Sequence, residues 1–275
     1  MKLATWNVNS VRARKDRLLR WLETHRPDVL CLQEIKGNEE DFPTVETTAL
    51  GYHAAIHGQK GWNGVAILSL TQPQRIERGF GDDTDDGHAR LISAEIGGVR
   101  VASAYVPNGQ GVGSDKWAFK LAWLKRLRAW LDRRSPLAPL AVCGDFNVAP
   151  DERDVKHPAL WEPSVLFHPE ARQGLQHVMA WGLEDVFRRH HQEGGLYSWW
   201  DYRMLAFPKN DGLRIDLVLA TPSLAERSTA ASIDREERKG VQPSDHAPVI
   251  TEFDLSRPFS GSDAPGIGGS HAASS

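Results

Sequence analysis

Several apolar, strand-like runs of this sequence end in carboxylates or amides, where a buried strand would ordinarily continue with another aliphatic residue. The residues concerned are Asn7, Asn9, Glu34, Asp145, Asn147, Asp216, Asp245 and His246. Asp216 shows the pattern most clearly, because it stands in an aliphatic run and faces opposite to Ile215 and Leu217. A carboxylate is costly to bury in such a strand unless it is paired. Ligand sites of α/β proteins commonly lie where strand ends converge, so we expect these groups to meet.

The chemistry of this set points to a phosphate substrate. Carboxylate and amide oxygens without thiolates suit a hard cation such as Mg²⁺, which keeps several waters beside its protein ligands. Phosphodiester hydrolysis needs charge neutralisation, an oriented water and donors for the transition state, and this set contains candidates for all three. An Asp beside a His, as in Asp245 and His246, sets the tautomer or tunes the charge of the imidazole. The sequence leaves open whether His246 acts as an acid or as an electrostatic donor.

Each of these residues alone has a structural alternative. Asp145 is also typical of a turn or a helix cap, and Glu34 of a loop exposed to solvent. Asp216 can form a structural ion pair with Arg214 or His246. The functional interpretation therefore depends on the set as a whole.

Short apolar runs rich in β-branched residues recur along the chain and predict strands. They lie at residues 3–8, 28–33, 65–70, 91–96, 99–106, 140–146, 197–202, 213–220, 229–233 and 247–253. Weaker candidates near His53 and Asp185 bring the expected number of strands to about a dozen. Open sheets seldom exceed about ten strands before they split, so the pattern favours two packed sheets.

Three segments carry the apolar periodicity of amphipathic helices, at residues 17–25, 116–134 and 169–181. Helices interspersed among many strands predict an α/β sandwich with helices outside both sheets. The basic stretches at residues 12–17, 120–128 and 188–189 are interpreted as solvated helix faces.

The composition is that of an ordinary globular protein, with 275 residues, 40% hydrophobic and 25% charged. Charged residues near the N-terminus and the lack of an apolar run of roughly 18 residues favour a cytoplasmic protein without membrane contact. The net charge of −3 gives no overall attraction to nucleic acid, so any DNA contact must be local. Cys31 and Cys143 lack zinc-spaced partners and are expected to be reduced core residues. A Gly, Ser, Ala and Pro-rich tail at 258–275 is predicted to be disordered after one catalytic domain at 1–257.

A series of motifs runs along the chain: TWNVNSVRA at 5–13, LQEIK at 32–36, HGQKG at 57–61, AYVPN at 104–108, GDFNVAP at 144–150, WWDYR at 199–203, GLRID at 212–216 and PSDHAP at 243–248. Together they resemble the exonuclease III and abasic endonuclease family of the DNase I-like superfamily. Motifs in the right order over most of the chain are strong evidence, whereas one alone would be weak. The resemblance implies a four-layer α/β sandwich with the active site at one rim of the paired sheets.

The resemblance also implies roles for individual residues. The metal is expected to be Mg²⁺, which Mn²⁺ can replace. Glu34 corresponds to the principal metal ligand, with Asn7 and Asp245 as further ligands or water-mediated supports.

The resemblance assigns the remaining residues to the phosphate and the attacking water. Asp145 corresponds to the residue that orients or deprotonates the water, and Asn147 to the amide that positions the nucleophile or phosphate. Tyr105 and Asn108 correspond to phosphate-side donors. His246, held by Asp216, corresponds to the imidazole that contacts the scissile phosphate.

For substrate choice, the family extrudes a base-less sugar into an apolar pocket, and Trp199, Trp200 and Leu213 hold the similar positions. Packing within a strand is the alternative for both tryptophans, and for Trp200 the two remain open. Arg203 opens a segment, 203–210, whose apolar and basic residues suit insertion into a DNA groove. This segment can instead fold over the core.

Two positions depart from the pattern of the family. Residue 9 is Asn where some relatives carry a carboxylate, so a role of Asn9 as a direct metal ligand is in doubt. Asn108 stands where a similar bacterial enzyme has Gln, and we expect its role to survive with altered reach.

The resulting hypothesis is a monomeric nuclease of base-excision repair that acts on double-stranded DNA with an abasic site or a 3′ end. Its expected activities are cleavage 5′ to abasic sites, cleaning of blocked 3′ ends and 3′ to 5′ exonuclease activity. One alternative is a phosphoesterase of the same superfold that acts on RNA, lipid headgroups or inositol phosphates. Another is a DNA-binding module without catalysis, which the intact acidic and amide positions disfavour.

Overall fold

The structure is a computed structural model that describes residues 1–84 and 87–259. Most of the tail predicted at 258–275 lies outside the described residues. At its start, the Arg227 guanidinium donates to the Pro258 carbonyl at 3.1 Å and packs over the Phe259 ring. No helix in the described ranges has the length and apolar character needed to cross a membrane.

The described residues form two six-stranded sheets, as the strand pattern predicts. The first sheet has the order β11-β12-β1-β2-β4-β3, and the second β5-β6-β7-β8-β10-β9. The strands are β1 (Lys2–Asn7), β2 (Val29–Gln33), β3 (His53–His57), β4 (Val65–Ser69), β5 (Gln74–Arg78), β6 (Leu91–Ile96), β7 (Val99–Tyr105), β8 (Leu140–Asp145), β9 (Glu184–Asp185), β10 (Asp216–Ala220), β11 (Ser228–Ile233) and β12 (Val249–Phe253).

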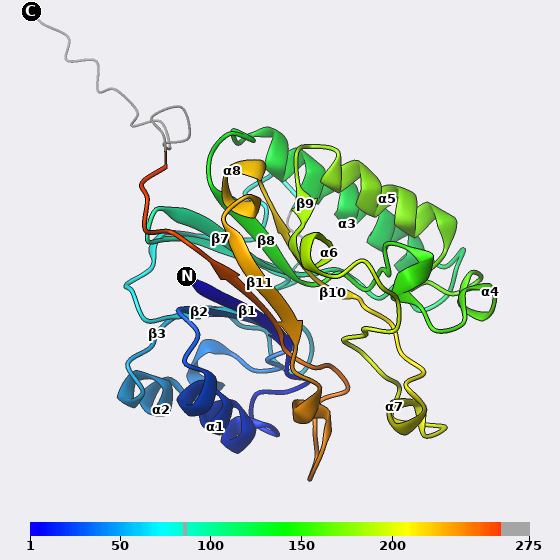
Figure 1. Ribbon diagram of the computed structural model, residues 1–275, viewed down its shortest axis with the longest axis horizontal. Coiled ribbons are helices and arrows are strands. Elements are labelled where there is room, and N and C mark those ends of the chain that lie inside the picture. The colour runs from blue at the N-terminus through cyan, green and yellow to red at the C-terminus, as the bar shows by residue number, and fades with distance from the viewer. Residues whose placement is uncertain (85–86, 260–275) are drawn as a thin grey trace, which may run out of the picture.

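Helices cover the outer faces of both sheets, which confirms the predicted four-layer α/β sandwich (Figure 1). In Figure 1, α1 and α2 lie below the strands and α3 and α5 above them. The helices are α1 (Lys15–His25), α2 (Thr44–Ala49), α3 (Asp115–Asp132), α4 (Pro158–Trp161), α5 (Pro169–Met179), α6 (Val186–His190), α7 (Ala206–Lys209) and α8 (Pro222–Ala225), with short 3-10 turns at Glu39–Asp41, Glu152–Asp154 and Arg235–Arg238.

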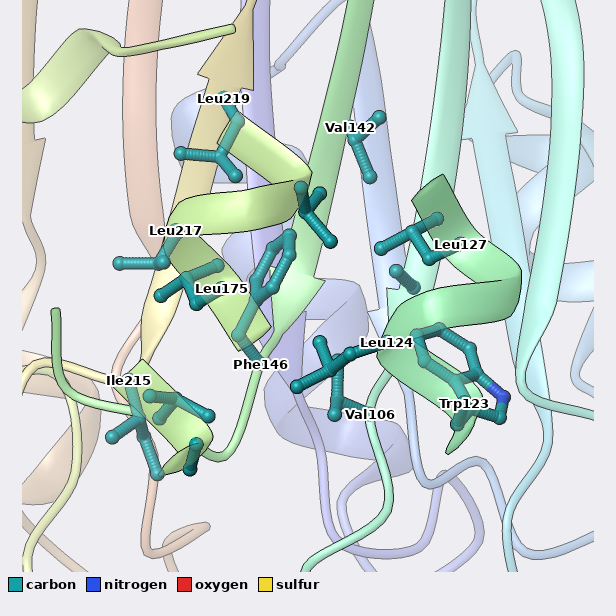
Figure 2. Close-up of a cluster of buried hydrophobic side chains, with 14 of the residues drawn as sticks. Val106, Trp123, Leu124, Leu127, Val142, Phe146, Leu175, Ile215, Leu217 and Leu219 are labelled. Atoms are coloured by element: carbon teal, nitrogen blue, oxygen red, sulfur yellow. The ribbon is translucent and has the colours of Figure 1, made fainter. Parts of the chain in front are cut away.

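The outer core on the second sheet shows how helical periodicity fixes these layers. Helix α3 turns Leu124 and Leu127 toward the sheet, and α5 adds Leu175 (Figure 2). They meet side chains such as Val142 and Leu217, which point outward from β8 and β10. Each fully buried aliphatic side chain of this kind stabilises the fold by roughly 1.5–3 kcal/mol.

Both sheets have one parallel strand pair at the centre, β1 with β2 and β7 with β8. Parallel strands end at the same edge, so Asn7 lies opposite Gln33, and Tyr105 lies opposite Asp145. The antiparallel β10 begins at this edge, where Asp216 lies opposite Asp145 of β8 in the strand register. The fold therefore brings polar strand ends from both sheets to one rim.

The layer between the sheets changes from apolar to polar toward this rim. Deep in the sandwich, Leu3, Cys31 and Cys143 pack in one buried cluster. Nearer the rim, the Gln33 amide donates to the Ser103 hydroxyl at 3.0 Å. Since alternate residues of a strand share a face, the same strands that fill the interior also aim their last side chains into the site.

One predicted strand is wrong, and one strand of the structure was not predicted. Residues 197–202 form isolated bridges, with Trp199 opposite Leu213 and His246, rather than a regular strand. Apolar residues alternate there as in a strand, but the segment bridges the chain at Leu213 to the chain at His246 and does not extend either sheet. Strand β5 was not predicted, because the edge strand Gln74–Arg78 is largely exposed and carries mostly polar residues.

Candidate active site

Asp145 stands at the centre of the polar rim, at the end of β8. Its Oδ2 accepts a hydrogen bond of 2.9 Å from the Asn7 amide, which also donates to Glu34 Oε1 at 2.8 Å. The Asn7 side chain thus joins the two carboxylates through its NH2 group. Its own oxygen accepts from the Asn9 backbone N–H at 3.0 Å, which fixes the orientation of the amide.

Glu34 follows β2 in a strained backbone conformation, with a φ of 50°. A positive φ is uncommon for a residue other than glycine and often marks a functional position. The turn is held by the Ser10 N–H, which donates to the Glu34 carbonyl at 2.7 Å. Lys36 adds an ion pair of 2.8 Å to Glu34 Oε2. The turn therefore ends the strand direction of β2 and directs the Glu34 carboxylate toward Asp145.

A second pair of residues approaches Asp145 from the opposite side. His246 Nδ1 lies 2.9 Å from Asp216 Oδ2, and its Nε2 lies 3.7 Å from Asp145 Oδ2. The Ser198 hydroxyl donates to the same Asp216 oxygen at 2.6 Å. Of the two structural partners that the sequence allows for Asp216, the structure selects His246. Arg214 instead pairs with Asp154 and Asp185.

The charges of these buried groups are coupled. Burial opposes a charge on the His246 imidazole, but the carboxylates of Asp216 and Asp145 outweigh this effect and raise the pKa of His246 to about 10. Burial also raises the pKa of Asp145 to about 7, with His246 opposing this increase and Asp216 adding to it. The site thus holds a cationic imidazole at neutral pH beside a carboxylate that ionises in the physiological range.

The amides and the phenol lie on the β7 and β8 side of the rim. Asn147 donates from its backbone N–H to Asp145 Oδ1 at 2.9 Å, and its Oδ1 accepts from the Asn108 amide at 3.1 Å. Burial, together with the negative charges of Glu34 and Asp145, raises the pKa of Tyr105 well above its ordinary value. Tyr105 therefore remains a protonated donor at neutral pH.

Asp245 is fixed on the opposite side by two donors. Its Oδ2 accepts from the Trp199 indole at 3.0 Å, and its Oδ1 accepts from the Asn9 amide at 3.0 Å. Asn9 Oδ1 in turn accepts from the Lys36 ammonium at 2.6 Å. Both oxygens of Asp245 are thus occupied by protein donors, an arrangement that matches a supporting role.

The three residues expected to wall a sugar pocket do not share one environment. Trp200 and Leu213 are fully buried, and Trp200 packs with Phe207 in a small cluster while its indole donates to Asn210. Neither presents surface to a substrate in this structure. Of the two alternatives left open for Trp200, the structure shows packing, and the pocket role expected for Leu213 has no support in its burial. Trp199 is partly buried and lies edge-on to Trp161, with ring centroids 6.0 Å apart.

Arg203 lies outside this hydrogen-bonded set. Its guanidinium is mostly exposed and forms an ion pair of 2.7 Å with Asp201. Nearby, Met204 and Leu205 are also exposed, and both have positive φ angles. Residues 203–205 therefore present apolar and basic side chains to solvent, whereas Ala206 and Phe207 fold over a small buried cluster with Trp200.

The donor set fits a hard divalent cation. One ligand atom each of Glu34, Asp145 and His246 lies within 4.8 Å of the others. His246 is a poor ligand, because its Nδ1 faces Asp216 and its raised pKa keeps the ring protonated. Two carboxylates remain, with the amide of Asn7 between them. Oxygen donors without thiolates are the set that magnesium and manganese prefer.

Sequence reasoning missed three supporting residues. Ser198 holds Asp216, and the Arg90 guanidinium lies over the Tyr105 ring, 4.6 Å from its centroid. Lys120 was assigned to a solvated helix face, but its side chain is buried. Its ammonium donates to the backbone carbonyls of Asn108 and Asn147. For Lys120 a signal was available, since residue 120 falls three positions after Trp117 and four before Leu124, on the apolar face.

Comparison with known proteins agrees with this geometry. The sequence model of the Endonuclease/Exonuclease/phosphatase family matches residues 4–246. Exodeoxyribonuclease III of Haemophilus influenzae is 37% identical over 266 residues, which cover 92% of this chain and 100% of the relative.

Two solved structures share the fold over nearly all of their length. An AP endonuclease from Archaeoglobus fulgidus superposes with a TM-score of 0.90 at 39% identity, covering 93% of this chain and 100% of that one. The 3′ phosphatase NExo from Neisseria, bound to a product DNA hairpin, superposes with a TM-score of 0.89 at 38% identity, covering 92% and 99%. With the carboxylates, amides and imidazole assembled at one rim, these matches establish that the chain is a hydrolytic enzyme and belongs to the Endonuclease/Exonuclease/phosphatase family.

Proposed function

We propose that this enzyme is a DNA-repair nuclease that cleaves the backbone 5′ to abasic sites and removes blocking groups from 3′ ends, with 3′ to 5′ exonuclease activity from the same site. The observation that carries the proposal is the arrangement around Asp145, with Glu34 joined through Asn7 on one side and His246 held by Asp216 on the other. Relatives with this fold bear names that describe these activities.

The roles follow from charge and position. We assign Mg²⁺, which Mn²⁺ can replace, to Glu34, with Asn7 and Asp245 in support; the ion would neutralise charge on a non-bridging phosphate oxygen. Asp145, which ionises near neutral pH, orients and deprotonates the attacking water. His246 stays cationic at that pH and stabilises the negative charge that develops on the phosphate. Tyr105, Asn108 and Asn147 supply further donors on the phosphate side.

Duplex DNA with an abasic site or a 3′ end is the proposed substrate. An abasic nucleotide is easy to extrude because it has no base pair to lose. Trp199 is placed to wall the extruded sugar, since its indole is fixed on Asp245 beside the catalytic groups. The exposed segment at Arg203, Met204 and Leu205 suits contact with a DNA groove. We further propose that the enzyme acts as a monomer in the cytoplasm.

The test compares three substrates under one set of conditions. Purified enzyme with Mg²⁺ is incubated with an abasic duplex, a duplex with a 3′-phosphate end and an undamaged duplex with a recessed 3′ end. Incision of the abasic duplex and release of the 3′ phosphate are expected, and the third substrate measures the exonuclease share. If none of the three is processed while a lipid-headgroup or inositol phosphate ester is hydrolysed, the proposed substrate class is wrong.

A further inference from the structure

A buried lysine lies directly behind the amides of the site. Lys120 projects from α3 and its side chain is fully buried. Its ammonium donates to the carbonyls of Val165 at 2.6 Å, Asn147 at 2.7 Å and Asn108 at 3.0 Å. An ammonium has three N–H donors, so all of them are used. Three chain segments that are distant in sequence therefore converge on one cation.

The partners of this cation are unusual for a buried charge. Burial lowers the pKa of Lys120 to about 7, with the charge of Asp145 opposing the effect. The three carbonyl bonds favour the charged form, because only the ammonium has three N–H donors. Charged groups that are buried are ordinarily paired with an opposite charge. An aliphatic side chain at this position of α3 would pack beside Trp117 and Leu124 without the cost of desolvating a charge. Core packing alone therefore does not account for a lysine here.

What the ammonium holds is specific to the site. The loops that follow β7 and β8 carry Asn108 and Asn147, whose side-chain amides are hydrogen-bonded to each other at 3.1 Å. The Asn147 amide also reaches Asp145 Oδ2 at 3.2 Å, from a backbone with a φ of 49°. The first loop packs closely on the lysine stem, because a Cβ added at Gly109 would lie 3.1 Å from Lys120 Cδ. The ammonium thus connects the backbones of both loops immediately behind their functional amides.

We infer that Lys120 is a positioning residue of the active site, which ties the Asn108 and Asn147 loops together so that their amides keep the geometry needed by the phosphate. The inference rests on the proposed function for the role of the two amides. The ties themselves do not depend on it, since they are backbone contacts within this chain. The two amides are hydrogen-bonded to each other, so the geometry that Lys120 holds should matter mainly while this pair is intact, and Asn147→Ala breaks it.

The test is a double-mutant cycle in single-turnover cleavage of an abasic duplex at saturating Mg²⁺. Lys120→Met keeps the length and loses the charge and donors, and it should slow cleavage about 10- to 100-fold, the range expected when catalytic groups shift by up to an ångström. Binding of the uncleaved duplex in EDTA should change less than about threefold, because Lys120 does not reach the surface. In an Asn147→Ala background, Lys120→Met should slow cleavage less than about threefold further. Lys125→Met, on the exposed face of the same helix, is the matched control and should behave as wild type.

Two outcomes of this cycle would overturn the inference. One is cleavage by Lys120→Met at the wild-type rate, and the other is an equal loss in both backgrounds, which would indicate a general structural effect. If Lys120→Met does not fold, Lys120→Gln, which keeps donors without charge, goes through the same cycle.

A second readout separates the inference from the proposed function. Amide hydrogen exchange at residues 106–109 and 146–149 should be faster in Lys120→Met than in Lys125→Met, whether or not DNA is cleaved. Equal exchange in these segments would show that Lys120 does not hold the loops. Wild-type enzyme that leaves every DNA substrate intact would refute the proposed function, and this exchange experiment would still decide on Lys120.

Discussion

Asp216 and His246 form a buried pair in which the imidazole Nδ1 lies 2.9 Å from one carboxylate oxygen and 3.1 Å from the other. The Ser198 hydroxyl accepts the backbone N–H groups of Ile215 and Asp216 and donates to the carboxylate, which fixes the pair at the start of β10. The pair leaves Nε2 facing Asp145. The carboxylate of Asp216 thus sets both the direction and the charge of the imidazole.

Replacing Asp216 by Asn should shift the alkaline decrease in activity to lower pH. The amide can still bond His246 but no longer supplies a negative charge, so the pKa of His246 should decrease from about 10. We expect a loss of kcat of roughly 10²–10⁴-fold, larger at pH 9 than at pH 7. The measurement is the pH profile of kcat, with Asp132→Asn on the exposed end of α3 as control. An alkaline limb unchanged from wild type would refute the assigned role of Asp216.

Asp145→Asn and His246→Ala should each remove most turnover and leave DNA binding nearly intact. Both side chains act on the reacting water and phosphate rather than on the remaining duplex, so their loss raises the transition-state barrier. Single-turnover rates and equilibrium binding to an abasic duplex check this prediction. Near-normal turnover of His246→Ala at saturating metal would show that His246 has another role.

Glu34→Ala should raise the concentration of Mg²⁺ needed for half-maximal activity by about tenfold or more, because a carboxylate ligand is lost. Added metal should restore part of the rate. Glu39→Ala, a nearby exposed carboxylate, serves as the control. A metal dependence identical to that of wild type would remove Glu34 from the metal site.

The His246 pair should also make folding stability depend on pH in the metal-free enzyme. The pKa of His246 is raised from 6.5 to about 10 by Asp216 and Asp145 against the effect of burial, so its contribution is fully present below pH 6.5 and is lost as pH rises through 10. Urea unfolding in EDTA should therefore show that wild type exceeds His246→Asn most at pH 6, by on the order of a few kcal/mol, and less at pH 10. His177→Asn, at an exposed position of α5, is the control. A difference that grows between pH 6 and pH 10 would contradict the assigned pairing.

The convergence of the catalytic groups was predictable because it follows from strand periodicity. Asn7, Asp145 and Asp216 lie on the same faces as the small apolar residues of the inter-sheet core, and parallel central strands bring their ends together. The sheet count, the helical layers and the four-layer architecture follow from the same alternation and from helical spacing.

Environment-dependent features were not accessible from the sequence. Trp200 and Leu213 stand in family motifs, yet both are buried, Trp200 in a small cluster with Ala206 and Phe207 and Leu213 in the outer core of the second sheet. Helical spacing places Lys120 on the apolar face of α3 and so signals its burial, but only the path of the loops at Asn108 and Asn147 places acceptors around its ammonium. Tertiary context, rather than local pattern, decides such positions.

The most direct measurement of the central claim is incision of an abasic duplex by wild-type enzyme and by Asp145→Asn, each with Mg²⁺ and with EDTA, followed by mapping of the product ends. The account predicts one nick immediately 5′ to the abasic site, leaving a 3′ hydroxyl, made by wild type with Mg²⁺ and reduced by at least about 10³-fold in the variant and in EDTA. An intact duplex with the wild-type enzyme, or equal nicking by Asp145→Asn, would contradict it.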